Sequence, residues 1–174
     1  WYLVNASLTQ PMAWGHNEGC EFVEKSCDQW QKGRYRCSNP NDKACSYDRR
    51  AKAYCDVRYF RTNLPSGEHH FTDAREGGFS ALLDYCPVYR SYADGHCAKP
   101  GHSSNSWEEK CESCRCFESS ASDEVFQDGV GTACHRMRCL NSSALEIRLG
   151  NTWRSCPTDG GFISLSPLID GWGG

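Results

Sequence analysis

The chain has 174 residues, a formal net charge of −3 and a sequence pI of about 6.1, which excludes the basic surface that nucleic-acid binding requires. Its mean hydropathy is −0.68, and no stretch approaches the roughly 20 apolar residues of a membrane-spanning helix. Its thirteen cysteines argue against a reduced cytosolic protein and indicate a disulfide-rich domain folded in the secretory pathway.

All thirteen cysteines are therefore disulfide candidates, and each bridge that closes a loop would contribute about 2–4 kcal/mol. Because the number is odd, at most six internal bridges can form and one cysteine is left over. The chain begins at Trp1 and ends at Gly174, and both ends are interpreted as cuts in a longer or processed polypeptide. The candidates are Cys20, Cys27, Cys37, Cys45, Cys55, Cys86, Cys97, Cys111, Cys114, Cys116, Cys134, Cys139 and Cys156.

The first half of the chain predicts short elements between turns. Residues 1–14 read as the exit from a helix into a turn, since Pro11 prevents a continuing helix. Cys20, Val23 and Cys27 have the spacing of one face of a short helix. A turn is expected at residues 39–42, followed by one or two helical turns over residues 48–54.

The rest of the chain is rich in turns at first and more strand-like in its last third. Pro65-Ser66-Gly67 marks a turn. Residues 79–85 fit a helix turn or a short strand, and an irregular piece of packing core is favoured. An exposed loop is expected at residues 98–106. Residues 145–149 alternate apolar and polar side chains and predict a β-hairpin with residues 152–154. A third strand is expected at residues 162–165. The fold class is therefore α+β with much irregular structure, disulfide-rich, with short antiparallel strands and few short helices.

Two metal or redox interpretations of the cysteines are weaker than disulfides. Cys111, Cys114 and Cys116 could form a zinc site with His96, His102 or His135, but a second C-x-x-C unit is absent. Redox catalysis at Cys111 and Cys114 has no βαβ pattern around it. We expect no metal ligands in this chain.

No catalytic constellation is expected either. The chain contains neither H-E-x-x-H nor G-x-S-x-G. His69 and His70 are adjacent and point to different faces, so they are interpreted as surface-loop residues. The basic run at residues 49–52 is short, lies between Asp48 and Asp56, and is interpreted as a solvated face.

Two sequons make Asn5 and Asn141 glycosylation candidates in a secreted protein. Trp107, Trp153 and Trp172 could serve a binding face, although packing of the indoles against disulfides is the commoner use.

The order of several motifs resembles the leishmanolysin-type zinc metallopeptidases. Trp1-Tyr2, the segment MAWGHNEGCEF at residues 12–22 and Cys27 resemble the stretch that follows the catalytic core of that family. Residues 83–88 (LDYCPV) and 92–97 (YADGHC) look like its D-Y-C-P and Y-x-D-G-x-C segment. Its later motifs are matched by Arg115-Cys116-Phe117, by Cys134 with Cys139, and by Gly160-Gly161-Phe162-Ile163.

The resemblance implies a metzincin endopeptidase whose zinc is held by H-E-x-x-H and a later histidine above a Met-turn. None of those residues maps onto this chain, and Met12 belongs to the later motif instead of the Met-turn. The resemblance divides the chain into the end of the catalytic domain, residues 1–25, and a cysteine-rich C-terminal domain, residues 26–174. Leu165 stands where the family pattern has a cysteine; the odd thiol is explained either by that replacement or by a partner in the missing N-terminal part.

The resulting hypothesis is a non-catalytic C-terminal part of a secreted or cell-surface zinc metalloendopeptidase that supports the active-site cleft. Its partners would be the N-terminal catalytic part of the same protein and protein substrates or extracellular proteins. Zinc belongs to the whole enzyme, and none is bound by this chain. The alternative is a stand-alone cysteine-rich extracellular adhesion or interaction module derived from such a protease.

Overall fold

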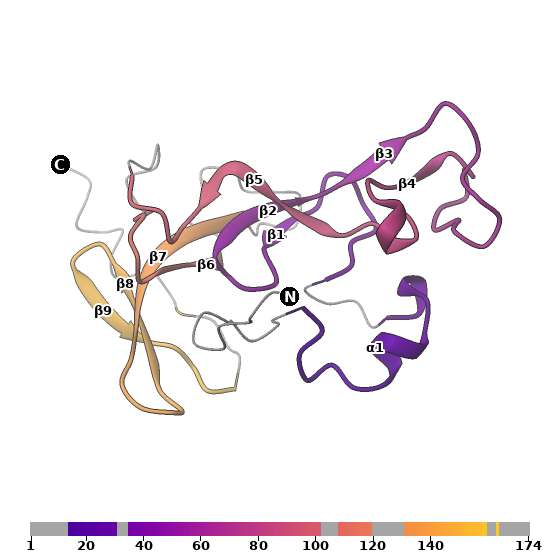
Figure 1. Ribbon diagram of the computed structural model, residues 1–174. Helices are drawn as coiled ribbons and strands as arrows, with labels where there is room; N and C mark the ends of the chain where they lie inside the picture. The colour runs from indigo at the N-terminus through magenta and orange to yellow at the C-terminus, as the bar shows by residue number, and fades with distance from the viewer. Residues whose placement is uncertain (1–13, 31–34, 102–107, 120–130, 160–162, 164–174) are drawn as a thin grey trace, which may run out of the picture. The chain divides into compact units, whose positions relative to one another are not determined.

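The computed structural model describes residues 14–30, 35–101, 108–119, 131–159 and 163 (Figure 1). Short antiparallel strands and disulfides dominate this part of the chain, as expected, but the helical content is too small for the α+β label to fit more than loosely. The elements are α1 (Glu21–Glu24), the 3₁₀ helices η2 (Cys27–Gln29) and η3 (Ala81–Leu83), and the strands β1 (Lys43–Cys45), β2 (Ala51–Cys55), β3 (Val57–Tyr59), β4 (Glu76–Gly78), β5 (Tyr89–His96), β6 (Cys114–Ser119), β7 (Gly131–Cys139), β8 (Leu145–Leu149) and β9 (Thr152–Ser155).

The strands form three sheets, with the orders β1-β2-β5, β3-β4 and β6-β7-β8-β9. The chain divides into two compact units. The first unit comprises Trp1–Asp48 and Ala53–Arg90, and the second comprises Arg49–Lys52 and Ser91–Gly174. No helix in the described ranges is long and apolar enough to cross a membrane.

The short helix of the first unit differs from its prediction. The helix α1 has four residues, and Val23 is 83% exposed, whereas Cys27 is buried in the following 3₁₀ helix. The spacing of Cys20, Val23 and Cys27 therefore does not mark one buried face. Cys27 instead joins Cys86 and Val88 in a small core against which Trp14, Trp30 and Leu83 pack.

The predicted turns of the first unit are present. The amide of Asp42 donates to the carbonyl of Asn39, and the amide of Glu68 donates to that of Pro65. Of the structures open for residues 79–85, the helix turn is present, as η3, and the packed core piece is only partly so: Leu83 contacts the core, but Leu82 is 96% exposed.

The helical turns predicted for residues 48–54 are wrong, because this segment contains strand β2. Ala51, Ala53 and Cys55 are buried, and the residues between them are half-buried. The period of two is that of a strand. Its inward side chains are small, so the apolar alternation is weak and the charged residues dominate the sequence pattern.

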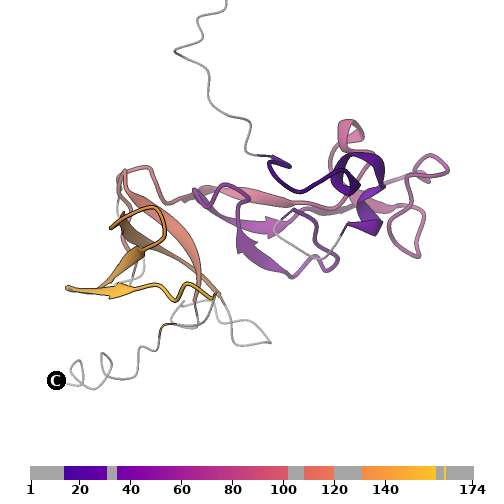
Figure 2. The same ribbon diagram turned by 90° about the horizontal axis from the view of Figure 1, so that it is seen from below.

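The second unit contains the most regular part of the described chain, a four-stranded antiparallel sheet seen as the salmon (β6), orange and yellow strands in Figure 2. The predicted hairpin is confirmed, with Ile147 opposite Arg154 and Leu149 opposite Thr152. Ile147 and Leu149 are buried, as the alternation predicts, and Gly150 supplies the positive φ of the turn. The strand expected at residues 162–165 falls outside the described residues except for residue 163.

Candidate functional site

Five aromatic side chains of the first unit form a cluster that we call the aromatic junction. Its members are Trp14, Phe22, Trp30, Tyr35 and Tyr47. The ring centroid of Trp14 lies 4.8 Å from that of Tyr35 and 5.1 Å from that of Tyr47, edge to face in both cases. Phe22 stacks on Trp30 at 4.3 Å. These are favourable aromatic geometries, and they join residues 14–22 to residues 30–47.

The glycine of the Trp-Gly motif is required by this cluster. Gly15 has φ +70°, and a Cβ at this position would lie 2.5 Å from a ring carbon of Phe22. Its amide donates a hydrogen bond of 3.1 Å to the hydroxyl oxygen of Tyr35. A larger residue would separate Phe22 from the chain it packs on, so this motif serves packing.

The Asp-Tyr-Cys-Pro motif also sets backbone geometry. Asp84 and Tyr85 both have positive φ, and the carbonyl of Tyr85 accepts a hydrogen bond of 2.6 Å from the amide of Gly78. A Cβ on Gly78 would lie 2.0 Å from the carbonyl oxygen of Cys86. This close approach places Cys86 beside Cys27, to which it is disulfide-bonded.

A buried carboxylate organises the arginines of the first unit. The side chain of Asp56 is 5% exposed and accepts hydrogen bonds from Arg58 at 3.1 Å and from Arg90 at 2.9 Å. Burial would raise the pKa of Asp56, but the hydrogen bonds from the two arginines outweigh it and hold this pKa below its ordinary value. Both guanidinium groups also lie over the ring of Phe79, at 5.7 and 4.6 Å.

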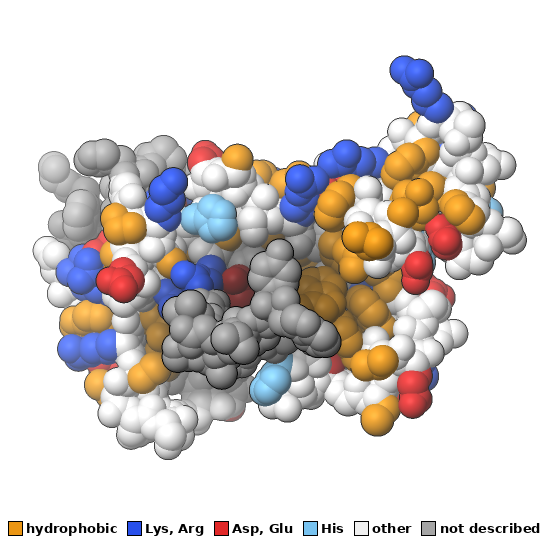
Figure 3. Space-filling model, viewed as in Figure 1, with side chains coloured by type: hydrophobic (Ala, Val, Ile, Leu, Met, Phe, Trp, Pro, Cys, Tyr) orange, Lys and Arg blue, Asp and Glu red, His pale blue; other side chains and the backbone are white. Residues whose placement is uncertain are grey.

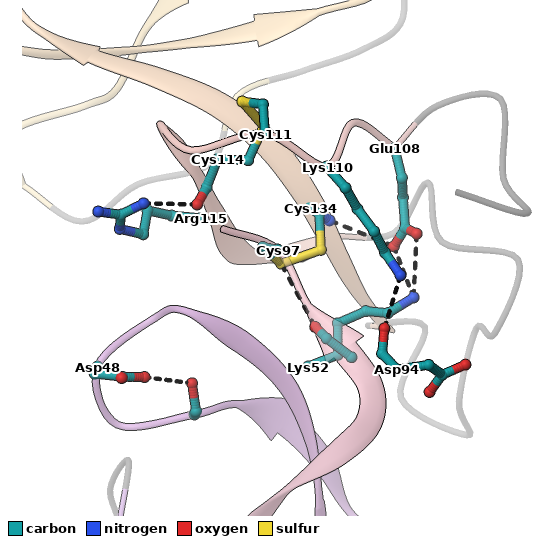
Figure 4. The surroundings of a disulfide bond; sticks show 12 residues. Asp48, Lys52, Asp94, Cys97, Glu108, Lys110, Cys111, Cys114, Arg115 and Cys134 are labelled. Atoms are coloured by element: carbon teal, nitrogen blue, oxygen red, sulfur yellow. Dashed lines mark hydrogen bonds and ion pairs between the residues drawn. A yellow bond between two sulfur atoms is a disulfide. The ribbon is translucent and has the colours of Figure 1, made fainter. Parts of the chain in front are cut away.

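A second buried carboxylate supports a disulfide of the second unit. Figure 4 shows the Lys52 ammonium and the amide of Cys134 directed at the Glu108 carboxylate, at 2.9 and 3.3 Å. The side chain of Glu108 is 2% exposed. Cys134 is disulfide-bonded to Cys97. The basic run is thus not simply solvated, because Lys52 forms this ion pair and Arg49 forms another with Glu118.

Glu109 forms a separate network. Its carboxylate lies 2.6 Å from Arg136 and 2.6 Å from Arg148. Burial would raise the pKa of Glu109, but the hydrogen bonds from the two arginines lower it below its ordinary value. Sequence reasoning singled out none of Asp56, Glu108 and Glu109. The available signal was weak: Asp56 directly follows Cys55 at the end of β2, and Glu108 and Glu109 lie three and two positions before Cys111.

His135 is buried in strand β7, and its Nδ1 has no hydrogen-bond partner. Burial lowers the pKa of His135 below its ordinary value, although the charges of Glu108 and Glu109 oppose this shift. In the register of β6 and β7 it pairs with Arg115, whereas Cys114 pairs with Arg136. Neighbouring residues of a strand point to opposite faces, so His135 and Cys114 do not converge.

The zinc interpretation of the cysteines can be tested directly on this geometry. In the described ranges, one group of three potential ligands has its ligand atoms within 4.8 Å of one another: Glu109, Cys111 and Cys114. The sulfurs of Cys111 and Cys114 are bonded to each other, and the Glu109 carboxylate is held by two arginines. These residues therefore do not fit a zinc ion as they stand.

The remaining histidines lie apart from this group. The Nε2 atoms of His69 and His70 lie within hydrogen-bonding distance of the backbone carbonyls of Leu64 and Asp84. His16 and His96 are exposed, and His102 is outside the described residues. Among the described residues, no histidine pair is brought together with a carboxylate in a metal-ligand group.

Ten of the thirteen candidate cysteines are disulfide-bonded. The chain-entropy relation assigns about 4 kcal/mol to the loop closed by Cys27–Cys86, whose ends are 59 positions apart, and about 2 kcal/mol to the loop closed by Cys111–Cys114. Cys20 and Cys139 are free and exposed; Cys156 is free, and its partial burial raises the pKa of its thiol. The bridges are Cys27–Cys86, Cys37–Cys55, Cys97–Cys134 and Cys111–Cys114, and Cys45 and Cys116 are also disulfide-bonded.

The surface candidates are only partly described. Asn141 is exposed, and its side-chain oxygen accepts hydrogen bonds from the amide and hydroxyl of Ser143. Trp153 is half-buried, and the guanidinium of Arg138 lies over its ring, 4.2 Å from the centroid. Asn5, Trp107 and Trp172 lie outside the described residues.

The motifs that shape this site lie within a region that matches one protein family along nearly the entire chain. The family model described as leishmanolysin, of the M8 peptidases, matches residues 1–172. The chain belongs to the leishmanolysin family. The region is therefore one of leishmanolysin-type protease sequence, and the family is one of zinc metallopeptidases.

Individual relatives agree with this family membership. The chain is 28% identical to a leishmanolysin of Leishmania tropica over 96% of this chain and 27% of that protein. It is 27% identical to a leishmanolysin-like peptidase of Drosophila melanogaster over 99% of this chain and 31% of that protein. A shorter match to a leishmanolysin of Leishmania amazonensis is 34% identical over 56% of this chain and 17% of that protein. The chain thus spans less than a third of the length of these relatives.

Proposed function

We propose that this chain is the non-catalytic C-terminal part of a leishmanolysin-type zinc metalloendopeptidase and supports the substrate cleft of the catalytic part. The boundary would lie near residue 25, with residues 1–25 ending the catalytic domain and residues 26–174 forming the cysteine-rich domain. The aromatic junction carries the proposal, since it packs Trp14 and Phe22 before this boundary onto Trp30, Tyr35 and Tyr47 after it. Such a contact would hold the end of the catalytic domain against the disulfide-bonded cysteine-rich domain.

The buried charges favour support over catalysis. Asp56, Glu108 and Glu109 each accept hydrogen bonds from basic side chains. A general base needs a free acceptor that can take a proton from substrate, and these carboxylates are already engaged. The zinc and the residues that hold it would belong to the rest of the whole protein.

Trp14→Ala in the whole protein tests this support. The loss of its ring contacts is expected to lower the free energy of unfolding by about 2–3 kcal/mol and to reduce kcat/KM on a fluorogenic peptide at least about fivefold at assay temperature. Trp153→Ala is the matched control, since it removes a half-buried indole of the second unit outside the junction. Its kcat/KM should stay within about twofold of wild type. A Trp14→Ala enzyme that is destabilised but fully active would contradict the proposal.

Metal content provides a separate test. We expect less than about 0.1 zinc per chain by elemental mass spectrometry on the purified, oxidised 174-residue chain, because Cys111 and Cys114, the sulfurs of the one ligand group in the described ranges, are bonded to each other. Stoichiometric zinc that survives complete oxidation of the thiols would show that this chain holds a metal site of its own.

An exposed patch favours a second candidate, an extracellular interaction module. Tyr59, Phe79 and Leu82 are exposed in the first unit. Figure 3 shows hydrophobic side chains gathered over β3 and β4. Arg75 lies over the Tyr59 ring at 4.4 Å. Exposed aromatic residues with arginine are typical of binding hot spots.

The intact mass of the native protein distinguishes the two candidates. A native species near 19.6 kDa plus glycan would favour this module, and a much larger intact mass would favour the protease part.

The disulfides also favour an extracellular or cell-surface location reached through the secretory pathway. In that setting Asn5 and Asn141 would carry glycans. For Asn141 the support is its exposure. Digestion of the native protein with peptide-N-glycosidase should convert Asn141 to Asp. Recovery of all of the Asn141-containing peptide with an unmodified Asn would contradict this expectation.

A further inference from the structure

The Cys111–Cys114 disulfide spans a turn that the backbone already closes. The amide of Cys114 donates to the carbonyl of Cys111 at 2.9 Å. Before and after the turn, the amide of Cys111 donates to the carbonyl of Cys97, and the amide of Met137 donates to that of Ser113. These bonds do not involve sulfur, so the turn is held in place whether or not the disulfide is formed.

Cys111 also differs in exposure from the other bonded cysteines. It is half-buried, whereas the other nine disulfide-bonded cysteines in the described ranges are at most 6% exposed. Its partner Cys114 is completely buried. Because thiol–disulfide exchange requires in-line access to one sulfur, Cys111 is the sulfur of this framework most open to attack.

The charges near Cys114 favour its departure as a thiolate. Figure 4 shows Arg115 next to Cys114 at the turn. The guanidinium of Arg115 donates to the carbonyls of Glu112 and Cys114, at 3.0 and 2.8 Å, so it holds the backbone of the turn, and its side chain belongs to the face of β6 opposite that of Cys114. Arg136 lies directly opposite Cys114 in the register of β6 and β7. Glu109 is the one acidic group within 4.8 Å of both sulfurs in the described ranges, and its charge is compensated by Arg136 and Arg148. Neighbouring cations stabilise a thiolate.

We infer that Cys111–Cys114 is a thiol–disulfide exchange site whose substrates are thiol compounds, with Cys111 as the attacked sulfur and Cys114 as the leaving sulfur. This inference concerns neither the zinc site nor the cleft and does not depend on the proposed function. It assigns the C-x-x-C turn a chemistry distinct from the bracing role of the buried bridges.

The exchange proceeds in two balanced steps. The thiolate of the incoming compound attacks Cys111 Sγ, the Cys111–Cys114 bond breaks, and its electron pair leaves on Cys114 Sγ as a thiolate. A second thiolate of the same class attacks the substrate sulfur of the mixed disulfide and releases Cys111 as a thiolate. Two thiols are oxidised to one disulfide, the protein disulfide takes up two electrons, and the two protons of the thiols pass to Cys111 and Cys114. The reverse reaction oxidises the protein dithiol.

Glutathione redox buffers test the site on the full 174-residue chain. After equilibration at stepped ratios of reduced to oxidised glutathione, acid quenching and alkylation, mass spectrometry would give the reduced fraction of each bridge. The relevant quantity is the squared concentration of reduced glutathione divided by the concentration of glutathione disulfide. We expect Cys111–Cys114 to be half-reduced at a value of this ratio about tenfold or more below the values for Cys27–Cys86, Cys37–Cys55 and Cys97–Cys134. Reduction together with those bridges, or after them, would overturn the inference even if no variant can be made.

Two single substitutions test the direction of attack. Cys114→Ser leaves Cys111 as a free, half-exposed thiol, which should form a mixed disulfide with oxidised glutathione. Cys111→Ser leaves the buried Cys114, which should do so at least about tenfold more slowly. The backbone bonds of the turn predict that both variants keep the far-ultraviolet circular dichroism of wild type. Equal rates, or a faster reaction at Cys114, would exclude Cys111 as the attacked sulfur.

Discussion

The two units achieve order by different means. In the first unit, β1, β3 and β4 have three residues each, and the chain between them is fixed by the aromatic junction, by Gly78 and by two disulfides. In the second unit, β6 and β7 form a six-residue antiparallel ladder, and β8 and β9 extend the sheet. A ladder pairs the backbone groups and fixes the chain at the same time. Where strands are short, the backbone groups pair in turns and loops, and side-chain packing and disulfides fix the chain.

This difference determines how each unit should respond to damage. A sheet spreads its stability over many similar hydrogen bonds and tolerates the loss of one contact. The first unit depends on fewer contacts, since the core cluster around Cys27–Cys86 contains that disulfide and Val88, with Trp14, Trp30 and Leu83 packed against it.

Removal of Cys27–Cys86 by the double substitution Cys27→Ala, Cys86→Ala should cost about 4 kcal/mol, since this bridge closes a wide loop and lies in the core. Hydrogen exchange measured by mass spectrometry should show lost protection in β3 and β4 and retained protection in β6 and β7. The matched control, Cys97→Ala with Cys134→Ala, should leave part of the β7 ladder protected. Equal loss of protection in both units after the first change would refute the contrast.

Gly78→Ala should lower the free energy of unfolding by about 3 kcal/mol, because the new Cβ would lie 2.0 Å from the carbonyl oxygen of Cys86 and the backbone must move. Gly101→Ala is the control: a Cβ at this position would meet no atom of a non-neighbouring residue within 4 Å, and the change should stay within about 0.5 kcal/mol. Denaturant titration measures both. If the two variants are equally stable, the close approach at Gly78 does not constrain the first unit.

The same contrast explains what the sequence could predict. The hairpin of residues 145–149 and 152–154 was predictable because long side chains alternate there at period two. Strand β2 was not, because its inward residues are Ala and Cys and its outward residues, Lys52 and Tyr54, are polar. The turns at Asn39 and Pro65 follow from local chemistry and were predicted from it.

The candidate site was only partly accessible from sequence. The Trp-Gly and Asp-Tyr-Cys-Pro motifs were recognised as family features, but their reasons are spatial: Gly15 faces Phe22, and Gly78 faces the carbonyl of Cys86. The aromatic junction unites residues up to 33 positions apart, from Trp14 to Tyr47. The ion pairs of Asp56 with Arg90 and of Lys52 with Glu108 span even greater separations, and no local pattern specifies them.

Acid should affect the two units at different pH. Burial places the folded-state pKa of His135 below its unfolded value, so the second unit loses stability as pH falls below about 6.5 and the unfolded chain binds a proton. The folded-state pKa of Asp56 is also below its unfolded value, since the hydrogen bonds from Arg58 and Arg90 outweigh the effect of burial, so its contribution persists above about pH 4 and is lost below.

Hydrogen exchange between pH 7 and pH 3.5, corrected for the intrinsic rate, measures this order. Protection in β7 should decline first, and His135→Gln should remove the decline between about pH 6.5 and pH 5. Protection in β3 should decline only near pH 4, and Asp56→Asn should reduce that step. If β3 loses protection before β7, the titrating groups are assigned to the wrong units.

The smallest expected effect compares one cation–π contact in each unit. In the second unit, the guanidinium of Arg138 in β7 lies 4.2 Å from the ring centroid of Trp153 in β9. In the first unit, that of Arg90 lies 4.6 Å from the ring centroid of Phe79. The distances are similar, and both arginines also pair with a carboxylate, but the Glu146 side chain that holds Arg138 is 15% exposed, whereas the Asp56 side chain that holds Arg90 is 5% exposed and binds its guanidinium more firmly. A fixed guanidinium loses less conformational entropy on stacking, so its contact should be stronger.

Double-mutant cycles measure this difference. With Arg replaced by Met and the ring by Leu, we expect a coupling free energy of about 0.5 kcal/mol for Arg138–Trp153 and about 1 kcal/mol for Arg90–Phe79. A larger coupling in the sheet unit would mean that isolated side-chain contacts matter as much where the ladder is long as where it is short.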